Sequence, residues 1–306
     1  MTVINMLNLG REGIAVADEQ SSAGSRKFNV AEKLHLIGGN VIYGGTGSAD
    51  LIRDVYEAAG GTVKSYLKEH SQVHVRDIYN IVNERMIDAT NDIKNNVLRT
   101  CLGITYGDLL TGMHSETGRP LDDAAKQNAG NVLRERSDYM NMGASIGGIQ
   151  DGHFEIYEVD TNGLGQKCSR PYSSIGSGAD ESQKVLSTFV ALLPRVAREK
   201  IGLAQGLAKT IEATNASSAL NVGVGGIPSI VYISKNGILR PDEESCILST
   251  ELVKGMTGEF LPEKFVHEKL EGLVKGEEKA RIVEREMMKN ATSRAKFLRF
   301  LRGYKD

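Results

Sequence analysis

The sequence predicts an α+β fold, and three observations indicate it. The chain opens with short apolar runs separated by glycine-containing turns, a pattern typical of antiparallel strands. Two long segments follow with an apolar side chain every three or four residues, as expected for amphipathic helices. Strict alternation of apolar and polar residues then returns near residue 150, so further strands follow the helices.

The first strands are expected at residues 2–9, 13–18, 33–37 and 41–46. The apolar runs VINML and GIAVA flank the turn GRE, so the first two strands form a hairpin. A strand that begins at residue 2 holds the start of the chain within the fold instead of letting it fray.

Two helices are expected next, at residues 48–69 and 74–100. Ser48 is a suitable N-cap, and Asp50 lies in the first turn, where the helix dipole favours a carboxylate. The polar run at 101–138 contains Gly, Pro and Asn and predicts an inserted loop or a short helical excursion. A lid and a ring contact are both open as its role.

The second half of the chain returns to strands and then to helices. A hairpin is expected at 141–160, with GIQDG as its turn. Helices are expected from about residue 180 to 195 and at 199–214, and a closing strand at 229–233. These elements complete a predicted domain of residues 1–240.

Residues 241–306 predict a helical and highly charged C-terminal extension. Pro262 suits the start of a helix. The final segment KFLRFLRGYK is basic and amphipathic. It packs on its own or a neighbouring subunit in one interpretation, and touches a membrane surface or a partner in another.

Composition indicates a cytoplasmic protein. The 306 residues carry a net charge of −2, which gives no electrostatic basis for binding nucleic acid or an anionic membrane. Cys101, Cys168 and Cys246 are widely spaced, so neither a disulfide framework nor a metal site follows from them. The apolar runs are too short to span a bilayer, and the neutral, strand-like opening is unlike a signal peptide.

Three residues near the start of the chain have the types and the order that an N-terminal nucleophile needs: Thr2, Asp18 and Lys33. Removal of Met1 would leave Thr2 with a free α-amine, whose pKa near ~7.7–8.0 lets it act as a base for its own hydroxyl. A nearby lysine favours the alkoxide, and an aspartate keeps that lysine charged and in place.

This stretch resembles a β-type subunit of the proteasome and of the related bacterial peptidase rings, which are N-terminal-nucleophile (Ntn) hydrolases. Thr2 matches their N-terminal threonine, Asp18 follows at the family's spacing, and Lys33 opens the strand KLHLI. The resemblance covers roughly residues 2–240. It implies a four-layer αββα sandwich, a threonine-type peptidase or amidohydrolase acting on peptides or proteins, and a homo-oligomer in which a ring is one arrangement.

The resemblance also assigns the oxyanion hole and a partner for the amine. The hairpin GGNVIYGG matches the strand that ends in the family's glycine pair, and the oxyanion amide is assigned to Gly45, with Gly44 and Gly47 as the neighbouring alternatives. Ser177, in the segment GSG, matches the serine that hydrogen-bonds the nucleophile's amine.

Five further positions follow from the same resemblance. Ser218 matches the serine of an Asp-x-x-Ser motif, and Asn215 replaces its aspartate, so one negative charge is missing from that network. Ser22, His35 and Tyr43 are candidates for binding the substrate side chain. A histidine packed between layers is an equal interpretation of His35.

Other chemistries find little support. No cofactor or metal is expected, because the six histidines form no HExxH motif and no Cys/His pairing. A lone G-x-G before a helix is a weak phosphate signal. Two alternative functions remain: a non-catalytic ring or scaffold component, and an Ntn amide hydrolase or transferase outside a proteolytic ring.

Overall fold

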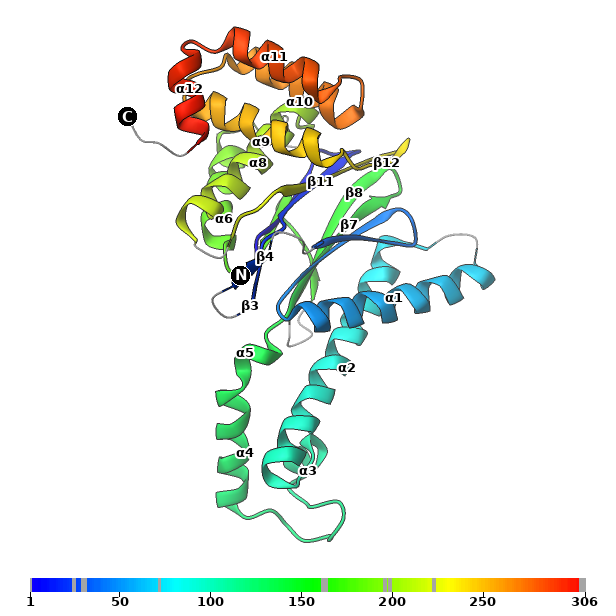
Figure 1. Ribbon diagram of the computed structural model, residues 1–306. Helices are drawn as coiled ribbons and strands as arrows, with labels where there is room; N and C mark the ends of the chain where they lie inside the picture. The colour runs from blue at the N-terminus through cyan, green and yellow to red at the C-terminus, as the bar shows by residue number, and fades with distance from the viewer. Residues whose placement is uncertain are drawn as a thin grey trace.

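The chain is an α+β protein with two five-stranded antiparallel sheets, as a computed structural model of it shows (Figure 1). The residues that the structure describes are 2–23, 26–28, 32–70, 73–160, 165–194, 197, 200–221 and 224–302.

The first sheet places the start of the chain beside two strand ends. Its order is β10-β1-β2-β11-β12, and all pairs are antiparallel. Ile4 pairs with Ala17 on one side and with Ile175 on the other, so Thr2 reaches the end of β2 and the loop that follows β10. The strands are β1 (Ile4–Asn8), β2 (Gly13–Asp18), β10 (Tyr172–Ile175), β11 (Pro228–Ser234) and β12 (Gly237–Leu239).

The second sheet supplies the lysine and a glycine loop. Its order is β5-β6-β7-β8-β9, again antiparallel. Lys33 directly precedes β5, and Gly47 directly follows β6. The strands are β5 (Leu34–Ile37), β6 (Val41–Thr46), β7 (Gly143–Gln150), β8 (His153–Asp160) and β9 (Gln166–Lys167). A separate pair, β3 (Ser21–Ala23) and β4 (Arg26–Phe28), lies between two of the expected strands.

Apolar clusters hold the two sheets together and attach helices to each. One cluster lies between the sheets and includes Met6, Ile42 and Phe154. A second joins the first sheet to α6 (Ala179–Leu192) and α8 (Leu203–Leu220). A third joins the second sheet to α1 (Ala49–Glu69) and α2 (Val75–Leu102). The expected strands and these helices are therefore present, with ends displaced by a few residues.

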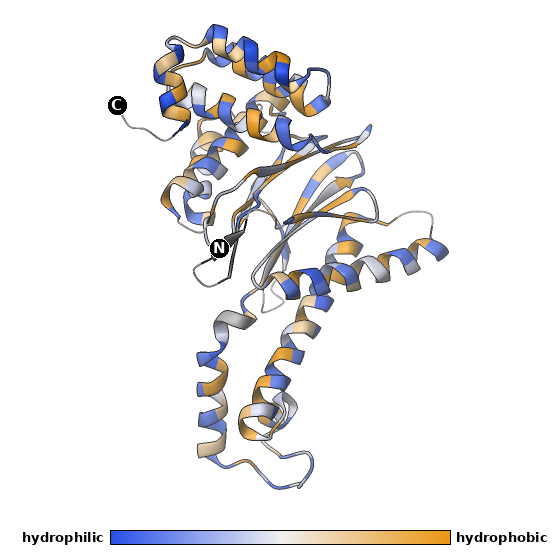
Figure 2. Cartoon of the chain, in the orientation of Figure 1, coloured by the Kyte–Doolittle hydropathy of each residue, from blue (hydrophilic) through white to orange (hydrophobic). Residues whose placement is uncertain are grey.

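The inserted run is helical and projects from the body as an arm (Figure 1). It contains α3 (Tyr106–Thr111), α4 (Asp123–Glu135) and α5 (Ser137–Met140), which pack along the second half of α2. Leu98, Ile104, Leu121 and Ala129 form its own apolar cluster. Apolar and polar residues alternate along α4, as Figure 2 shows. The helical excursion is the interpretation that the structure supports, rather than a loop.

The described part of the C-terminal extension forms four helices; the first two pack on α8, and the last two pack on the first of the four. They are α9 (Glu243–Thr257), α10 (Glu263–Lys275), α11 (Ala280–Asn290) and α12 (Arg294–Leu301). Phe297 of α12 is fully buried and lies 5.5 Å from Phe260, centroid to centroid. The tail therefore buries its apolar face against its own chain. Within the described residues, none of the helices has both the length and the apolar character to cross a bilayer.

Candidate active site

Thr2 lies at the edge of a cavity of about 920 Å³, held by the loop after β10. Its backbone nitrogen donates to Ser177 Oγ at 3.0 Å, as the sequence predicted for an amine at this position. Its carbonyl oxygen accepts from the Gly178 N–H at 3.1 Å. The Thr2 side chain is partly exposed, so a substrate can reach it. Met1 lies outside the described residues.

Gly176 lets this loop approach Thr2. Its φ is +97°, and a Cβ at this residue would lie 2.2 Å from the Thr2 carbonyl oxygen. Only glycine fits such a position, because any side chain would meet backbone that cannot move aside.

We expect Gly176→Ala to displace the loop and to slow any reaction of Thr2 by about 10²-fold, since a shift of one ångström in a reacting group has effects of that size. Gly237→Ala is the matched control, because Gly237 has a φ of +117° and open space at its Cβ position. The rate of covalent labelling at Thr2 measures the effect. Equal rates in the two variants would contradict the proposed contact.

Asp18 and Lys33 form a buried ion pair next to Val3, the residue that follows Thr2. Lys33 Nζ lies 2.7 Å from Asp18 Oδ1 and also donates to the Gln20 carbonyl oxygen at 2.7 Å. The same Asp18 oxygen accepts from the Val3 N–H at 2.8 Å. Asp18 is 1 % exposed and Lys33 6 %. A single carboxylate oxygen thus joins the ammonium to the residue that follows Thr2.

The other Asp18 oxygen is also held, since Oδ2 accepts from the Gly225 N–H at 3.2 Å. Two backbone donors and one ammonium therefore fix the carboxylate. Burial lowers the pKa of Lys33 from its ordinary value, and the Asp18 carboxylate opposes that shift. The result is a lysine whose proton is held less tightly than that of an exposed lysine.

The glycine beside Thr2 is Gly47, whereas the sequence assigned the oxyanion amide to Gly45. Gly45 lies inside β6, and a Cβ there would meet Ile52 and Tyr43. Gly47 lines the cavity with Thr2, has a φ of +128° and follows the strand end. Of the glycines that the sequence offered for the oxyanion amide, Gly47 is therefore the one that lines the cavity with Thr2.

The helix α8 turns different residues inward from the two that the sequence assigned. Asn215 and Ser218 are partly exposed, and neither side chain makes a hydrogen bond to a described residue. Thr214 and Ser217, one position earlier, are buried. Ser217 Oγ donates to the Gly178 carbonyl oxygen at 2.5 Å, so it is Ser217 that supports the loop over Thr2.

Of the predicted substrate-binding residues, neither Tyr43 nor His35 lines the cavity at Thr2. Tyr43 is 1 % exposed and belongs to the apolar cluster under α1 and α2. His35 stacks on Tyr56 with 4.4 Å between ring centroids, and burial lowers its pKa. This arrangement favours the packed interpretation of His35. Ser22 lies in β3, and its side chain is outside the described part of the structure.

Sequence reasoning missed the other wall of the cavity. Asn141, Met142 and Gly143 line it where the arm rejoins the body, and Glu158 and Asp160 line it at the end of β8. One feature of the sequence indicated this wall: the inserted run at 101–138 ends directly before the hairpin at 141–160, so the segment between them had to pass close to the end of a strand.

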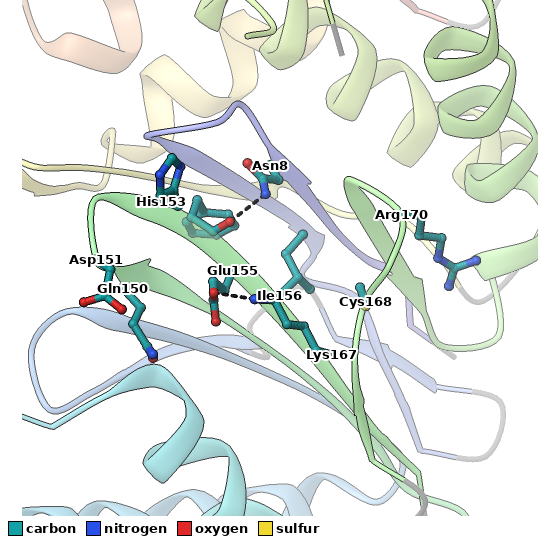
Figure 3. A pocket seen from close by; sticks show the side chains of 10 residues that line it. Asn8, Gln150, Asp151, His153, Glu155, Ile156, Lys167, Cys168 and Arg170 are labelled. Atoms are coloured by element: carbon teal, nitrogen blue, oxygen red, sulfur yellow. Dashed lines mark hydrogen bonds and ion pairs between the residues drawn. The ribbon is translucent and has the colours of Figure 1, made fainter. Parts of the chain in front are cut away.

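Figure 3 shows a second cavity, of about 300 Å³, between β1, β8 and β9. Three of the charged side chains that line it are paired, since Lys167 pairs with Glu155 and Arg170 pairs with Glu158. Burial raises the pKa of the Cys168 thiol to about 12, and the Glu158 carboxylate adds to the shift. A protonated thiol is a poor nucleophile, so this cavity is a weaker candidate than the one at Thr2.

Within the described residues, no group of three or more His, Cys, Asp or Glu side chains is arranged to hold a metal ion. A comparison with protein-family models finds no match, and a comparison with curated proteins finds none either.

Proposed function

We propose that the chain is a threonine-type Ntn hydrolase that cleaves amide bonds of peptides or proteins, with Thr2 as nucleophile once it is the first residue. One observation supports this most strongly. The Thr2 nitrogen is held by Ser177 Oγ, while the Asp18 oxygen that holds Val3 also holds the Lys33 ammonium. We propose that the amine, the hydroxyl and the buried cation act together, because this is the set that an N-terminal nucleophile requires.

The fold belongs to the same proposal. Helices α6 and α8 pack on one sheet, α1 and α2 pack on the other, and an apolar cluster lies between the sheets. This order is compatible with the four-layer αββα sandwich of Ntn hydrolases. The proteasome-like β subunit is the member of that group whose residues this chain resembles.

In the proposed reaction, Thr2 Oγ1 attacks the substrate carbonyl carbon and its proton passes to the neutral α-amine. The Lys33 ammonium favours the alkoxide, and the Gly47 N–H stabilises the oxyanion. The C–N bond then breaks, and the leaving amine takes the proton from the Thr2 ammonium. Water attacks the resulting ester, gives one proton to the α-amine, and releases the carboxylic acid and free Thr2.

A second candidate is a non-catalytic ring or scaffold component. The arm favours it, because α3 and α4 project from the body and offer surface to another chain (Figure 1). Under either function we expect a homo-oligomer in the cytoplasm, and gel filtration would measure its size. Peptide hydrolysis by the Met1-free protein, followed by mass spectrometry of the products, separates the two functions. If the Thr2→Ala variant hydrolyses peptides as fast as the wild-type protein, the threonine mechanism is rejected.

The reaction rate should depend on pH with a bell-shaped profile. The rate rises as the α-amine loses its proton, near the ordinary α-amine pKa of about 7.7–8.0. It falls again when Lys33 becomes neutral, since the cation beside the alkoxide is then lost. Because burial lowers the pKa of Lys33, we expect this fall below the ordinary lysine pKa of about 10.4. Labelling rates across pH, with Lys33→Met as control, measure both limbs; a profile that stays flat into the alkaline range would contradict the assignment.

A further inference from the structure

A row of buried polar side chains lies behind Thr2, and the reaction as described does not use most of it. Asn5 of β1, Ser182 of α6, and Thr214 and Ser217 of α8 are each at most 3 % exposed. Three different elements thus contribute polar groups to a layer that is otherwise apolar. Buried polar groups cost stability unless they are paired, so the pairing pattern is informative.

The hydrogen bonds of this row run in one direction. Asn5 Nδ2 donates to Thr214 Oγ1 at 2.9 Å and to Ser182 Oγ at 3.1 Å. Thr214 in turn donates to the Thr210 carbonyl oxygen at 3.0 Å. Ser217 donates to the Gly178 carbonyl oxygen, so its single proton is used there.

The donor in the hydrogen bond between Ser182 and Ser217 then follows. Their oxygens lie 2.7 Å apart. Because the Ser217 proton goes to Gly178, Ser182 must be the donor, and it shares its proton between Ser217 Oγ and the Ala213 carbonyl oxygen. Donation therefore runs from Asn5 to Ser182, from Ser182 to Ser217, and from Ser217 to Gly178.

This chain of donors ends at the loop that holds Thr2. The Gly178 carbonyl oxygen accepts a hydrogen bond from Ser217 Oγ, and the Gly178 N–H donates one to the Thr2 carbonyl oxygen. Ser177, the residue before it, accepts from the Thr2 nitrogen. When that nitrogen is an amine, one N–H directed at Ser177 leaves the lone pair free to face the Thr2 hydroxyl.

We infer that Asn5 and Ser182 are positioning residues for the proposed reaction: through Ser217 and Gly178 they fix the loop that orients the Thr2 amine. The inference rests on the proposed function. Asn5 Oδ1, by contrast, has no partner among the described residues. A buried asparagine with an unpaired side-chain oxygen lowers stability if its only role is packing. The two hydrogen bonds that Asn5 Nδ2 donates therefore explain why an asparagine stands at this position.

The test compares two substitutions with a matched control. Asn5→Leu keeps a side chain of similar size without donors, and Ser182→Ala removes one hydroxyl. Ser249→Ala is the control, because Ser249 is equally buried in a helix and donates only to the Ser245 carbonyl oxygen in α9. For each protein, the rate of β-lactone labelling at Thr2 is measured against pH, together with thermal unfolding.

We expect both substitutions to lower the labelling plateau by about 10-fold. We also expect the midpoint of the acid limb to move to lower pH, because a hydrogen bond from the ammonium to Ser177 favours the charged form and is weakened. Asn5→Leu should do this without loss of thermal stability, since it removes the unpaired acceptor. A purely structural role would instead lower stability and leave the midpoint in place, and that result would overturn the inference.

A readout independent of catalysis separates this inference from the proposed function. Periodate cleaves the Cα–Cβ bond of an N-terminal threonine, releasing acetaldehyde and ammonia as periodate is reduced to iodate. Both substitutions should make Thr2 react several-fold faster, because the loop holds it less firmly, and Ser249→Ala should not. Wild-type protein that resists the lactone while this pattern holds would reject the proposed function alone. Unchanged periodate rates would reject the positioning role.

Discussion

Thr2→Ala is expected to lower amide hydrolysis by on the order of 10⁴-fold or more, because both the attacking oxygen and its intramolecular base act from this residue. The substitution removes only the hydroxyl and one methyl group of a partly exposed side chain. The fold should therefore survive, and circular dichroism with gel filtration would show it. Hydrolysis of a peptide mixture measures the loss.

Thr2→Ser is the matched control for this prediction. Serine keeps the hydroxyl and the α-amine, so measurable activity should remain. Equal loss in both variants would mean that the threonine is needed for packing and not for chemistry. Full activity in the Thr2→Ala variant would show that the reaction takes place at another site of the molecule.

Lys33→Met is expected to have the second largest effect, on stability and on rate together. The substitution leaves the buried Asp18 carboxylate without its counter-ion, which lowers the free energy of unfolding by about 3–5 kcal/mol in comparable buried pairs. In the proposed reaction the Lys33 ammonium favours the Thr2 alkoxide, so its loss should also slow labelling by about 10²–10³-fold. Denaturant unfolding and β-lactone labelling measure the two effects.

A double substitution separates these effects. Asp18→Asn/Lys33→Met removes both charges, so no unpaired charge stays buried, and part of the stability should return. The rate should not return, because the cation is still missing. A double variant as unstable as the sum of its two single variants would show that the two side chains do not interact as the 2.7 Å contact implies.

The sequence predicted the parts of the fold that local patterns encode. The runs VINML and GIAVA became β1 and β2, and the antiparallel pairing of these strands places Asp18 next to Val3. The contact between Ser177 and the Thr2 nitrogen was expected from the resemblance to the family and not from a local pattern, since the two residues are 175 positions apart.

Two assignments in the candidate site differ from the residues that lie nearest to Thr2 or its loop, and each difference has a physical cause. Gly45 was chosen by matching letters, but the longer loop after β6 moves the glycine with positive φ to position 47. Asn215 and Ser218 were chosen in the same way. On a helix, neighbouring positions differ by about 100° in direction, so a shift of one residue exchanges an exposed pair for the buried pair Thr214 and Ser217.

Long-range packing was beyond the sequence. The sequence predicted a loop or a short helical excursion at 101–138 and not the separate helices α3, α4 and α5, because the few apolar residues that hold the arm, among them Leu121 and Ala129, are too sparse to make a clear period. The end of this run before the hairpin indicated a nearby strand end, but not that Met142 and Gly143 line the cavity at Thr2. Such contacts depend on where the arm begins and ends on the body.

The most direct measurement uses an epoxyketone on the Met1-free protein, followed by intact-mass analysis and peptide mapping. This reagent forms a ring with two atoms of one residue: the hydroxyl oxygen adds to the ketone, and the amine nitrogen opens the epoxide. The account predicts a mass gain equal to the whole reagent, located on Thr2 and absent from Thr2→Ala. A free Thr2 amine with no adduct, or an adduct on any other residue, would contradict it.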